Sequence, residues 1–129
     1  MRVLIANRGE IARRIIRTTG AWGVPSVAVF ADPDAHAPHV VEATSSERIG
    51  PASLEESYLS IDAILAAARR AEATHVHPGY GFLSERTDFA RAVVDAGLTW
   101  IGPSPEAGSE VTQLCAGADC RIKRGGSGI

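Results

Sequence analysis

The 129-residue chain is poor in several features that mark particular classes of protein. It has only two cysteines and a net charge of −2. No apolar run in it approaches the roughly 20 residues needed to span a bilayer. The charge gives no electrostatic basis for binding nucleic acid or an anionic membrane surface. The first residues, MRVLIANRGE, lack the long apolar centre of a signal peptide. These absences favour a cytoplasmic protein with neither nucleic acid nor a membrane as partner.

The cysteines give little support for a disulfide framework or a metal site. Cys115 and Cys120 stand near the C-terminus in a C-x4-C spacing, and none of the four histidines lies near them in the sequence. A zinc site would need further ligands close by. Distant ligands could converge in the fold, but unpaired thiols are the simpler interpretation, and we predict no metal site.

Short apolar runs alternate with helix-like segments along the chain. The length fits one domain, and 45% hydrophobic and 22% charged residues are typical of a globular protein. Such alternation predicts βαβ units and hence a parallel sheet covered on both faces. We predict an α/β fold, a Rossmann-like doubly wound parallel sheet with strand order 3-2-1-4-5. The expected strands are 2–6, 26–30, 47–50, 74–77 and 98–102, and the expected helices are 10–23, 39–43, 60–73 and 84–97.

Two local features refine the helices. The apolar residues of the first helix fall on two adjacent stripes, Ile11, Ile15, Thr18 and Ala12, Ile16, Thr19. Ser60 stands where its hydroxyl can cap the helix that follows it.

The composition changes after Ala107. Residues 108–129 are rich in glycine and have no sustained apolar periodicity. We therefore predict a domain over 1–107 and a tail over 108–129 that is disordered, a foreign junction or the product of an altered reading frame.

Two loops flank the place where a ligand would bind in this fold. In a sheet of order 3-2-1-4-5 the chain direction reverses between strands 1 and 4, and ligands bind outside the carboxyl ends of the strands there. The flanking loops are NRGE, residues 7–10, and HPGYGFLSE, residues 77–85. Glycines let backbone amides approach a ligand, and Tyr80 offers a flat apolar face with a hydroxyl. Alternatively, Gly79 and Gly81 only supply positive φ for a tight turn, and Phe82 packs against a helix.

Other candidate ligand residues carry open alternatives. Gly9 before a helix suggests a phosphate cradle, but G-x-G-x-x-G is absent, which disfavours NAD. Asp32 suits a ribose-binding acid or a turn equally well. Arg8 and Glu10 could pair with each other or across the crevice. The histidines have separate interpretations: His77 is the site candidate, His75 a sheet histidine, and His36 and His39 surface or packing residues.

The segments VLIANRGEIARRIIRT, SYLSIDAILAAA, HPGYGFLSE and GLTWIGPSPEA together resemble the N-terminal domain of biotin carboxylase. That domain also opens acetyl-CoA, propionyl-CoA, pyruvate and urea carboxylases. The resemblance covers about Arg2 to Ala107 and is looser between Asp34 and Gly50. It implies the pre-ATP-grasp fold and a ligase that uses MgATP and bicarbonate to form carboxyphosphate. The carboxyl group then passes to N1′ of biotin on a carrier domain.

The resemblance also implies roles for particular residues. His77, Gly79, Tyr80, Gly81 and Phe82 would line the biotin and bicarbonate side of the site. The neighbouring crevice wall would consist of Asn7, Arg8, Gly9 and Glu10, and Arg17 would lie toward a homodimer contact.

The sequence departs from the family after Ala107. The family continues into an ATP-grasp domain that holds ATP, Mg²⁺ and the catalytic residues, so we expect no catalytic residue here and no activity from this chain alone. The implied partners are that ATP-grasp domain, the biotin carboxyl carrier domain and a carboxyltransferase subunit. Two alternatives stay open: the same fold from another ATP-grasp ligase, and a stand-alone binding or interaction module.

Overall fold

The computed structural model describes residues 1–102 and the short strand 122–123. The predictions about Cys115, Cys120 and the remainder of the tail lie outside the described residues. The described elements follow each other in this order: β1 (Val3–Ile5), α1 (Gly9–Ala21), β2 (Ser26–Ala31), a 3-10 turn η1 (Asp32–Asp34), α2 (Pro38–Glu42), β3 (Ser45–Gly50), α3 (Ile61–Arg70), β4 (His75–His77), α4 (Thr87–Asp95), β5 (Thr99–Ile101) and β6 (Ile122–Lys123).

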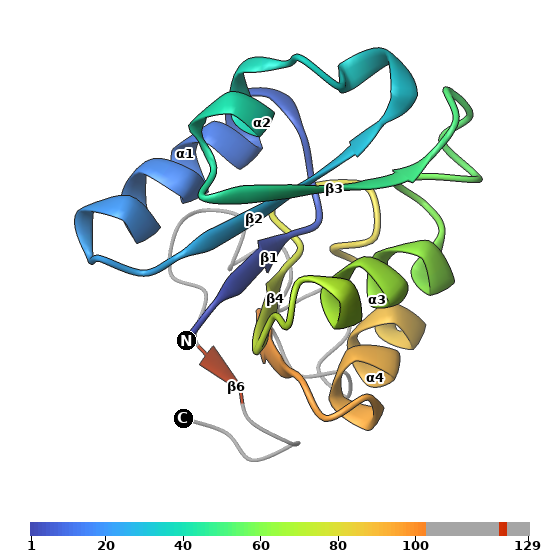
Figure 1. Ribbon diagram of the computed structural model, residues 1–129. Helices are drawn as coiled ribbons and strands as arrows, with labels where there is room; N and C mark the ends of the chain where they lie inside the picture. The colour runs from blue at the N-terminus through green and yellow to red at the C-terminus, as the bar shows by residue number, and fades with distance from the viewer. Residues whose placement is uncertain (103–121, 124–129) are drawn as a thin grey trace.

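The strands form one sheet in the order β3-β2-β1-β4-β5-β6 (Figure 1). The first five strands are parallel, which confirms the predicted order 3-2-1-4-5. β6 adds an antiparallel edge strand beside β5, from within residues 108–129. β1 lies between β2 and β4. The strands that follow β1 in sequence, β2 and β3, are added on one side of it, and β4 and β5 are added on the other side. The switch point therefore lies between β1 and β4.

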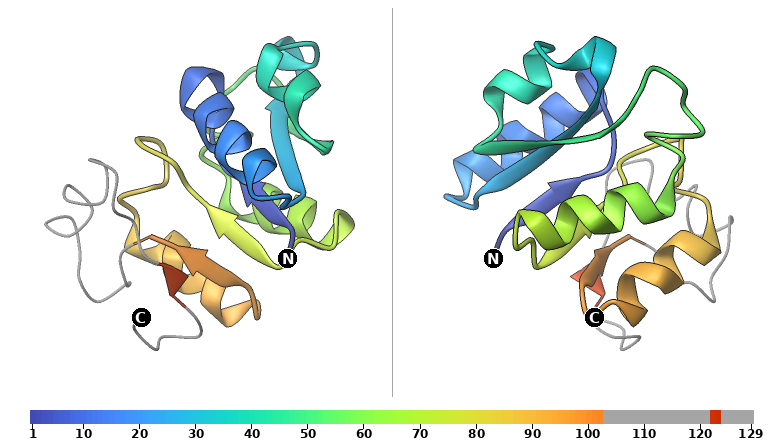
Figure 2. Two further views of the ribbon diagram at one scale, coloured as in Figure 1. Left: turned by 90° about the vertical axis from the view of Figure 1, so that its left-hand side faces the viewer. Right: turned by 45° about the vertical axis from the view of Figure 1, so that its right-hand side comes forward.

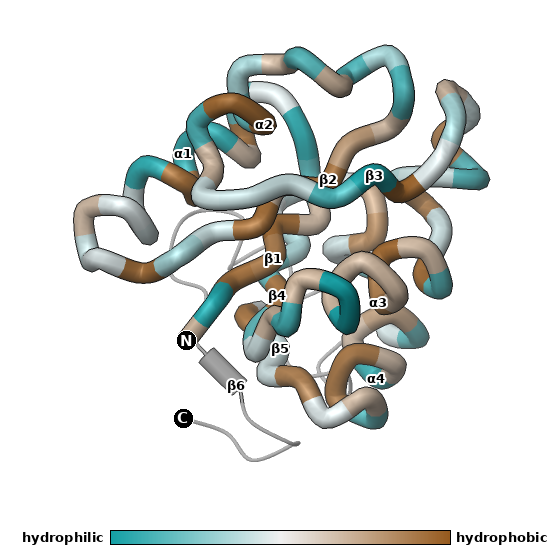
Figure 3. The backbone as a smooth tube through the Cα atoms, viewed as in Figure 1, coloured by the Kyte–Doolittle hydropathy of each residue, from teal (hydrophilic) through white to brown (hydrophobic). Residues whose placement is uncertain are grey.

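Helices cover both faces of the sheet. Figure 2 shows α1 and α2 on one face and α3 and α4 on the other. Alternate strand residues supply the two cores: Leu4, Val76 and Trp100 pack with α3 and α4, whereas Val3 and Ile5 pack with α1. Figure 3 colours β1 and part of α4 as hydrophobic, and their buried residues belong to these two cores. Because successive side chains of a strand point to opposite faces of the sheet, each strand contributes residues to both cores.

The helices follow the local signals of the sequence, with one refinement. Of the two candidate stripes on α1, Ala12, Ile16 and Thr19 form the buried one. The Ser60 hydroxyl oxygen accepts the backbone N–H of Ala63 at 3.2 Å, which confirms the predicted cap of α3. Within residues 1–102 and 122–123 no helix is both long enough and apolar enough to cross a bilayer.

Candidate functional site

The turns after β1 and β4 meet at the carboxyl edge of the sheet, and Asn7 joins them. Its Nδ2 donates to the carbonyl oxygens of Pro78, at 3.0 Å, and of Tyr80, at 2.7 Å. Its Oδ1 accepts the backbone N–H of Arg8 at 2.8 Å. Asn7 is buried, so water does not compete for these bonds. The two predicted crevice loops therefore lie side by side and are cross-linked by one side chain.

Gly79 and Gly81 have different structural reasons to be glycine. Both have positive φ, +68° and +73°, a region that favours glycine. A Cβ on Gly79 would stand 2.8 Å from Nδ2 of Asn7 and 2.9 Å from Cγ2 of Ile11, whereas a Cβ on Gly81 would meet no heavy atom within 4 Å. Gly79 is thus required by conformation and by the close approach of α1. Gly81 is required by conformation alone, and its outer side faces open space.

Tyr80 and Phe82 stand next to each other in the loop but lie in different surroundings. Tyr80 is 60% exposed, so its ring is available to a ligand at the rim. Phe82 is half-buried and stacks on Tyr58, with ring centroids 5.4 Å apart and an interplanar angle of 17°. Its φ of +47° is uncommon for a residue with a side chain. The loop holds Phe82 inward and presents Tyr80 outward.

His77 ends β4 beneath this loop, on the same sheet face as Ile5, its register partner in β1. Its Nδ1 accepts the backbone N–H of Gly79 at 3.0 Å, which places the ring proton of the neutral form on Nε2. Burial lowers the pKa of His77 to about 4. At neutral pH this histidine is therefore uncharged and brings no positive charge to the crevice edge.

The lowered pKa of His77 makes the stability of the domain depend on pH. In the unfolded chain its pKa lies near 6.5, so the unfolded state binds the proton first, and stability present above pH 6.5 is lost as the pH falls toward 4. We expect the free energy of unfolding to fall by about 2 kcal/mol over this range because of His77. His77→Asn retains an acceptor for Gly79 and should remove that part of the fall, measured by urea unfolding at pH 7 and pH 4. The exposed His36 provides the control, His36→Asn, and an unchanged pH profile in His77→Asn would contradict this assignment.

Arg8 extends from the first loop to three other segments of the chain. Its Nη1 lies 3.3 Å from Oδ2 of Asp34. Its guanidinium carbon lies 5.2 Å from the ring centroid of Tyr58 and 5.7 Å from that of Phe82. Both ring distances are within the range of cation–π contacts. Arg8 therefore does not pair with Glu10: its ion pair is with Asp34 in the loop after β2, and its ring contact with Phe82 reaches the loop after β4.

Asp34 and Tyr58 belong to this cluster, and the sequence reasoning did not assign either of them to the site. The hydroxyl of Tyr58 donates to Oδ2 of Asp34 at 2.8 Å and accepts the backbone N–H of Ala31 at 3.3 Å. Burial raises the pKa of Tyr58, so the hydroxyl keeps the proton that it donates. One signal could have found both residues. They follow β2 and β3, and parallel strands bring all such loops to the same edge.

Gly9 and Glu10 complete the first loop and begin α1. Gly9 has a φ of +63°, and a Cβ there would meet no heavy atom within 4 Å. Glu10 pairs with Arg13 at 3.6 Å and with Arg17 at 3.1 Å. Its carboxylate thus faces the arginines of α1, and as an exposed pair this contributes little stability.

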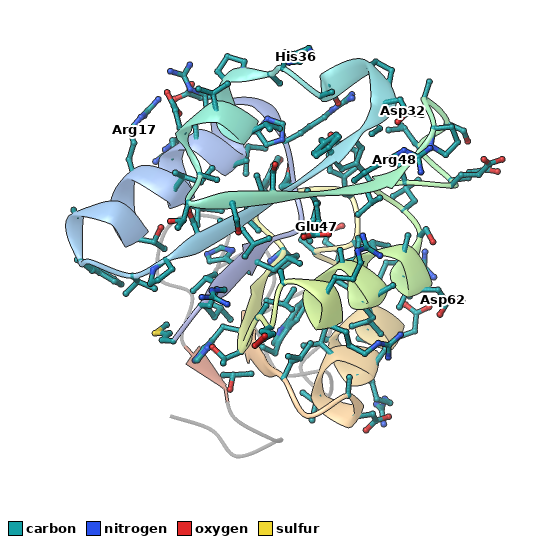
Figure 4. The ribbon with its side chains drawn as sticks, viewed as in Figure 1. Arg17, Asp32, His36, Glu47, Arg48 and Asp62 are labelled. Carbon is teal, nitrogen blue, oxygen red and sulfur yellow. The ribbon has the colours of Figure 1, made fainter. Side chains whose placement is uncertain are left out.

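Several other candidate residues lie away from the crevice loops. Figure 4 shows Arg17 extending from the outer side of α1, and Asp32 beside Arg48, whose Nε lies 2.6 Å from Oδ1 of Asp32. Asp32 thus pairs with its neighbouring strand. His39 is buried, with Nε2 3.1 Å from the carbonyl oxygen of Val29, as a packing histidine would be. Within residues 1–102 no group of three or more His, Cys, Asp or Glu side chains could hold a metal ion.

The sequence matches a known protein family. The sequence model described as "Biotin carboxylase, N-terminal domain" matches residues 1–107. The chain belongs to the biotin carboxylase N-terminal domain family. The Mycobacterium leprae biotin-dependent acyl-coenzyme A carboxylase alpha3 subunit is 56% identical over 106 residues, which are 82% of this chain and 18% of that subunit.

Solved structures of biotin carboxylase domains agree with this assignment. The domain from a single-chain bacterial carboxylase superposes with a TM-score of 0.78 at 51% identity, over 82% of this chain and 25% of that one. The Hydrogenobacter thermophilus 2-oxoglutarate carboxylase domain, a dimer in complex with MgADP, ADP and bicarbonate, gives 0.78 at 40% identity, over 82% and 23%. The chain therefore spans about a quarter or less of each of these relatives.

In this biotin carboxylase domain the predicted site residues form one connected group with a few outliers. Asn7, Arg8, Gly79 and Phe82 contact each other directly or through one shared neighbour. Tyr80 and Gly81 lie at the rim above them, and His77 bonds to Gly79 from below. The remaining three residues, Gly9, Glu10 and Arg17, lie along α1.

Proposed function

We propose that the crevice between the β1 and β4 turns forms the biotin-facing wall of a biotin carboxylase active site. In the parent enzyme, bicarbonate activated by MgATP would supply the carboxyl group, and biotin on a carrier domain would receive it. The observation that carries this proposal is the clasp by Asn7, which fixes the β4 loop so that Tyr80 projects from the rim. A fixed, exposed aromatic ring suits a bicyclic ligand with an apolar face and a ureido group.

We assign the following roles to the residues of the crevice. Tyr80 and Gly81 would contact the biotin ring, since both face open space. Gly79 and Phe82 would hold the loop, and neutral His77 would support it from beneath. Asn7, Arg8, Gly9 and Glu10 would form the adjoining wall. The exposed outer side of α1, with Arg17, is the face that we propose for a homodimer contact.

Magnesium and ATP do not fit the described residues. No acidic cluster suited to Mg²⁺ exists over residues 1–102, and no glycine-rich phosphate loop precedes α1. We therefore assign ATP, Mg²⁺ and the catalytic residues to an ATP-grasp domain of the parent enzyme. The further partners of this proposal are the carrier domain and a carboxyltransferase subunit.

Enzyme activity tests the proposal. We expect the purified 129-residue chain to show no bicarbonate-dependent ATP hydrolysis, because phosphoryl transfer needs metal and phosphate ligands. Residues 1–107 grafted in place of the matching segment of the M. leprae subunit should give an active enzyme, measured as bicarbonate- and biotin-dependent release of phosphate.

The unmodified M. leprae subunit and a mock purification are the controls for this experiment. Turnover by the 129-residue chain above the mock purification would contradict the proposed division of labour. A chimera that unfolds cooperatively but hydrolyses no ATP would contradict the biotin carboxylase role and favour a stand-alone binding module.

A further inference from the structure

The loops after β1, β2, β3 and β4 lie at the crevice edge of the sheet. The side chain of Arg8, in the first of them, contacts the other three. Arg8 lies in the loop after β1, Asp34 after β2, Tyr58 after β3 and Phe82 after β4. Parallel strands bring these loops to one edge but do not fix their relative positions. The contacts of the Arg8 guanidinium, 3.3 Å to Asp34, 5.2 Å to Tyr58 and 5.7 Å to Phe82, span all of them.

The chemistry of the cluster requires arginine. A guanidinium is planar and can stack on aromatic faces while its edge donates to a carboxylate, whereas an ammonium is a point charge. The partners are also tied to each other: Tyr58 donates to the same Oδ2 of Asp34 that faces Arg8 and stacks on Phe82. Phe82 in turn is two residues from Tyr80. The loops after β1, β2, β3 and β4 thus share one connected set of contacts.

We propose that Arg8 is a positioning residue that couples the loops after β2, β3 and β4 into one unit and thereby sets the position of the Tyr80 rim. Because it assigns Tyr80 to the biotin side, this inference rests on the proposed function. It adds Asp34 and Tyr58 to the machinery of the site as residues that act on the rim through Arg8 and Phe82. Neither needs to touch a ligand.

Amide hydrogen exchange in the full 129-residue chain tests the coupling. Each loop has a hydrogen-bonded amide as a reporter: Ala37 to the Asp34 carbonyl oxygen (2.9 Å), Leu59 to that of Leu54 (2.8 Å) and Ser84 to that of Gly81 (2.9 Å). Arg8→Met keeps an apolar side chain of similar length but removes the positive charge and the planar guanidinium group. We expect protection at all three reporters to fall together by about tenfold, with Val27 and Val76 in the sheet unchanged.

Two further variants separate coupling from general support. Arg8→Lys keeps the charge near Asp34 and should restore protection at Ala37 but not at Leu59 and Ser84, because the stacking is lost. Arg91→Met removes an exposed arginine of α4 that has no hydrogen bond or ion pair among the described residues and should change none of the reporters.

The pattern of protection decides the inference. A loss confined to one loop, no loss, or an equal loss at Val27 and Val76 would overturn the coupling. No ligand is present in this experiment, so its result is independent of whether Tyr80 binds biotin.

Discussion

Gly79→Ala should lower the free energy of unfolding by about 3 kcal/mol, a large effect for one added methyl group. The new Cβ would stand within 3 Å of Asn7 Nδ2 and Ile11 Cγ2, two groups held in place by α1 and by the clasp. Positive φ adds a conformational cost of its own. The loop must therefore move or the Asn7 bonds must break, and either outcome displaces Tyr80.

Gly81→Ala is the matched control for this prediction. Gly81 has nearly the same φ as Gly79 but open space where its Cβ would be, so only the conformational cost of about 1 kcal/mol applies. Urea unfolding of both variants at pH 7 measures the difference, provided that the slope with denaturant is unchanged. Equal midpoints for the two variants would show that the close packing at Gly79 does not constrain the loop.

Asn7→Asp should cost about 3 kcal/mol or more at pH 7, although the side chains have the same shape. The amide Nδ2 donates to two carbonyl oxygens, and a carboxylate can only accept, so the variant would bury negative charge against both. The loss should shrink as the pH falls, because the protonated carboxyl group can donate one of the two bonds.

Asn7→Ala provides the comparison for this prediction. It removes both bonds without adding charge, so we expect a loss of about 2 kcal/mol from the unsatisfied carbonyl groups and no recovery at low pH. Unfolding free energies of the two variants at pH 7 and pH 4, each referred to the wild type, separate repulsion from simple loss of the bonds. A loss below 1 kcal/mol in both variants, at the level of ordinary surface substitutions, would show that the clasp does not hold the loops.

The strand order and the switch point could be predicted from the sequence because both follow from alternation. Short apolar runs such as VLIA and SVAVF, separated by amphipathic helices, leave few ways to build a parallel sheet. The loops at the crevice then follow from the strand order. Asn7 and Gly79 were assigned to the crevice on that basis, and the structure brings them into contact.

The side-chain contacts could not be predicted, because they join residues far apart in sequence. Asp34 lies 26 residues from Arg8 in the sequence. Aspartate is a common residue at the start of a helix, so the local sequence explains Asp34 without any ligand or distant partner. Tyr58 lies between β3 and α3 in SYLSIDAILAAA, a segment that resembles the family, but the resemblance gave it no role in the site. Only the three-dimensional structure shows that these residues meet at the edge shared by the loops after β1 to β4. The inward stripe of α1 was ambiguous for a different, local reason: the adjacent residues Ile15 and Ile16 are equally apolar.

The central claim, that Tyr80 faces biotin, is tested most directly by the kinetics of the chimera that carries residues 1–107. We expect Tyr80→Ala to raise KM for free biotin by about tenfold and to leave KM for ATP unchanged, because the proposal assigns the lost ring to the biotin side alone. Trp22→Ala, which removes another exposed aromatic ring beyond the C-terminal end of α1, should change neither constant. An unchanged KM for biotin in Tyr80→Ala, or a rise in KM for ATP instead, would contradict the account.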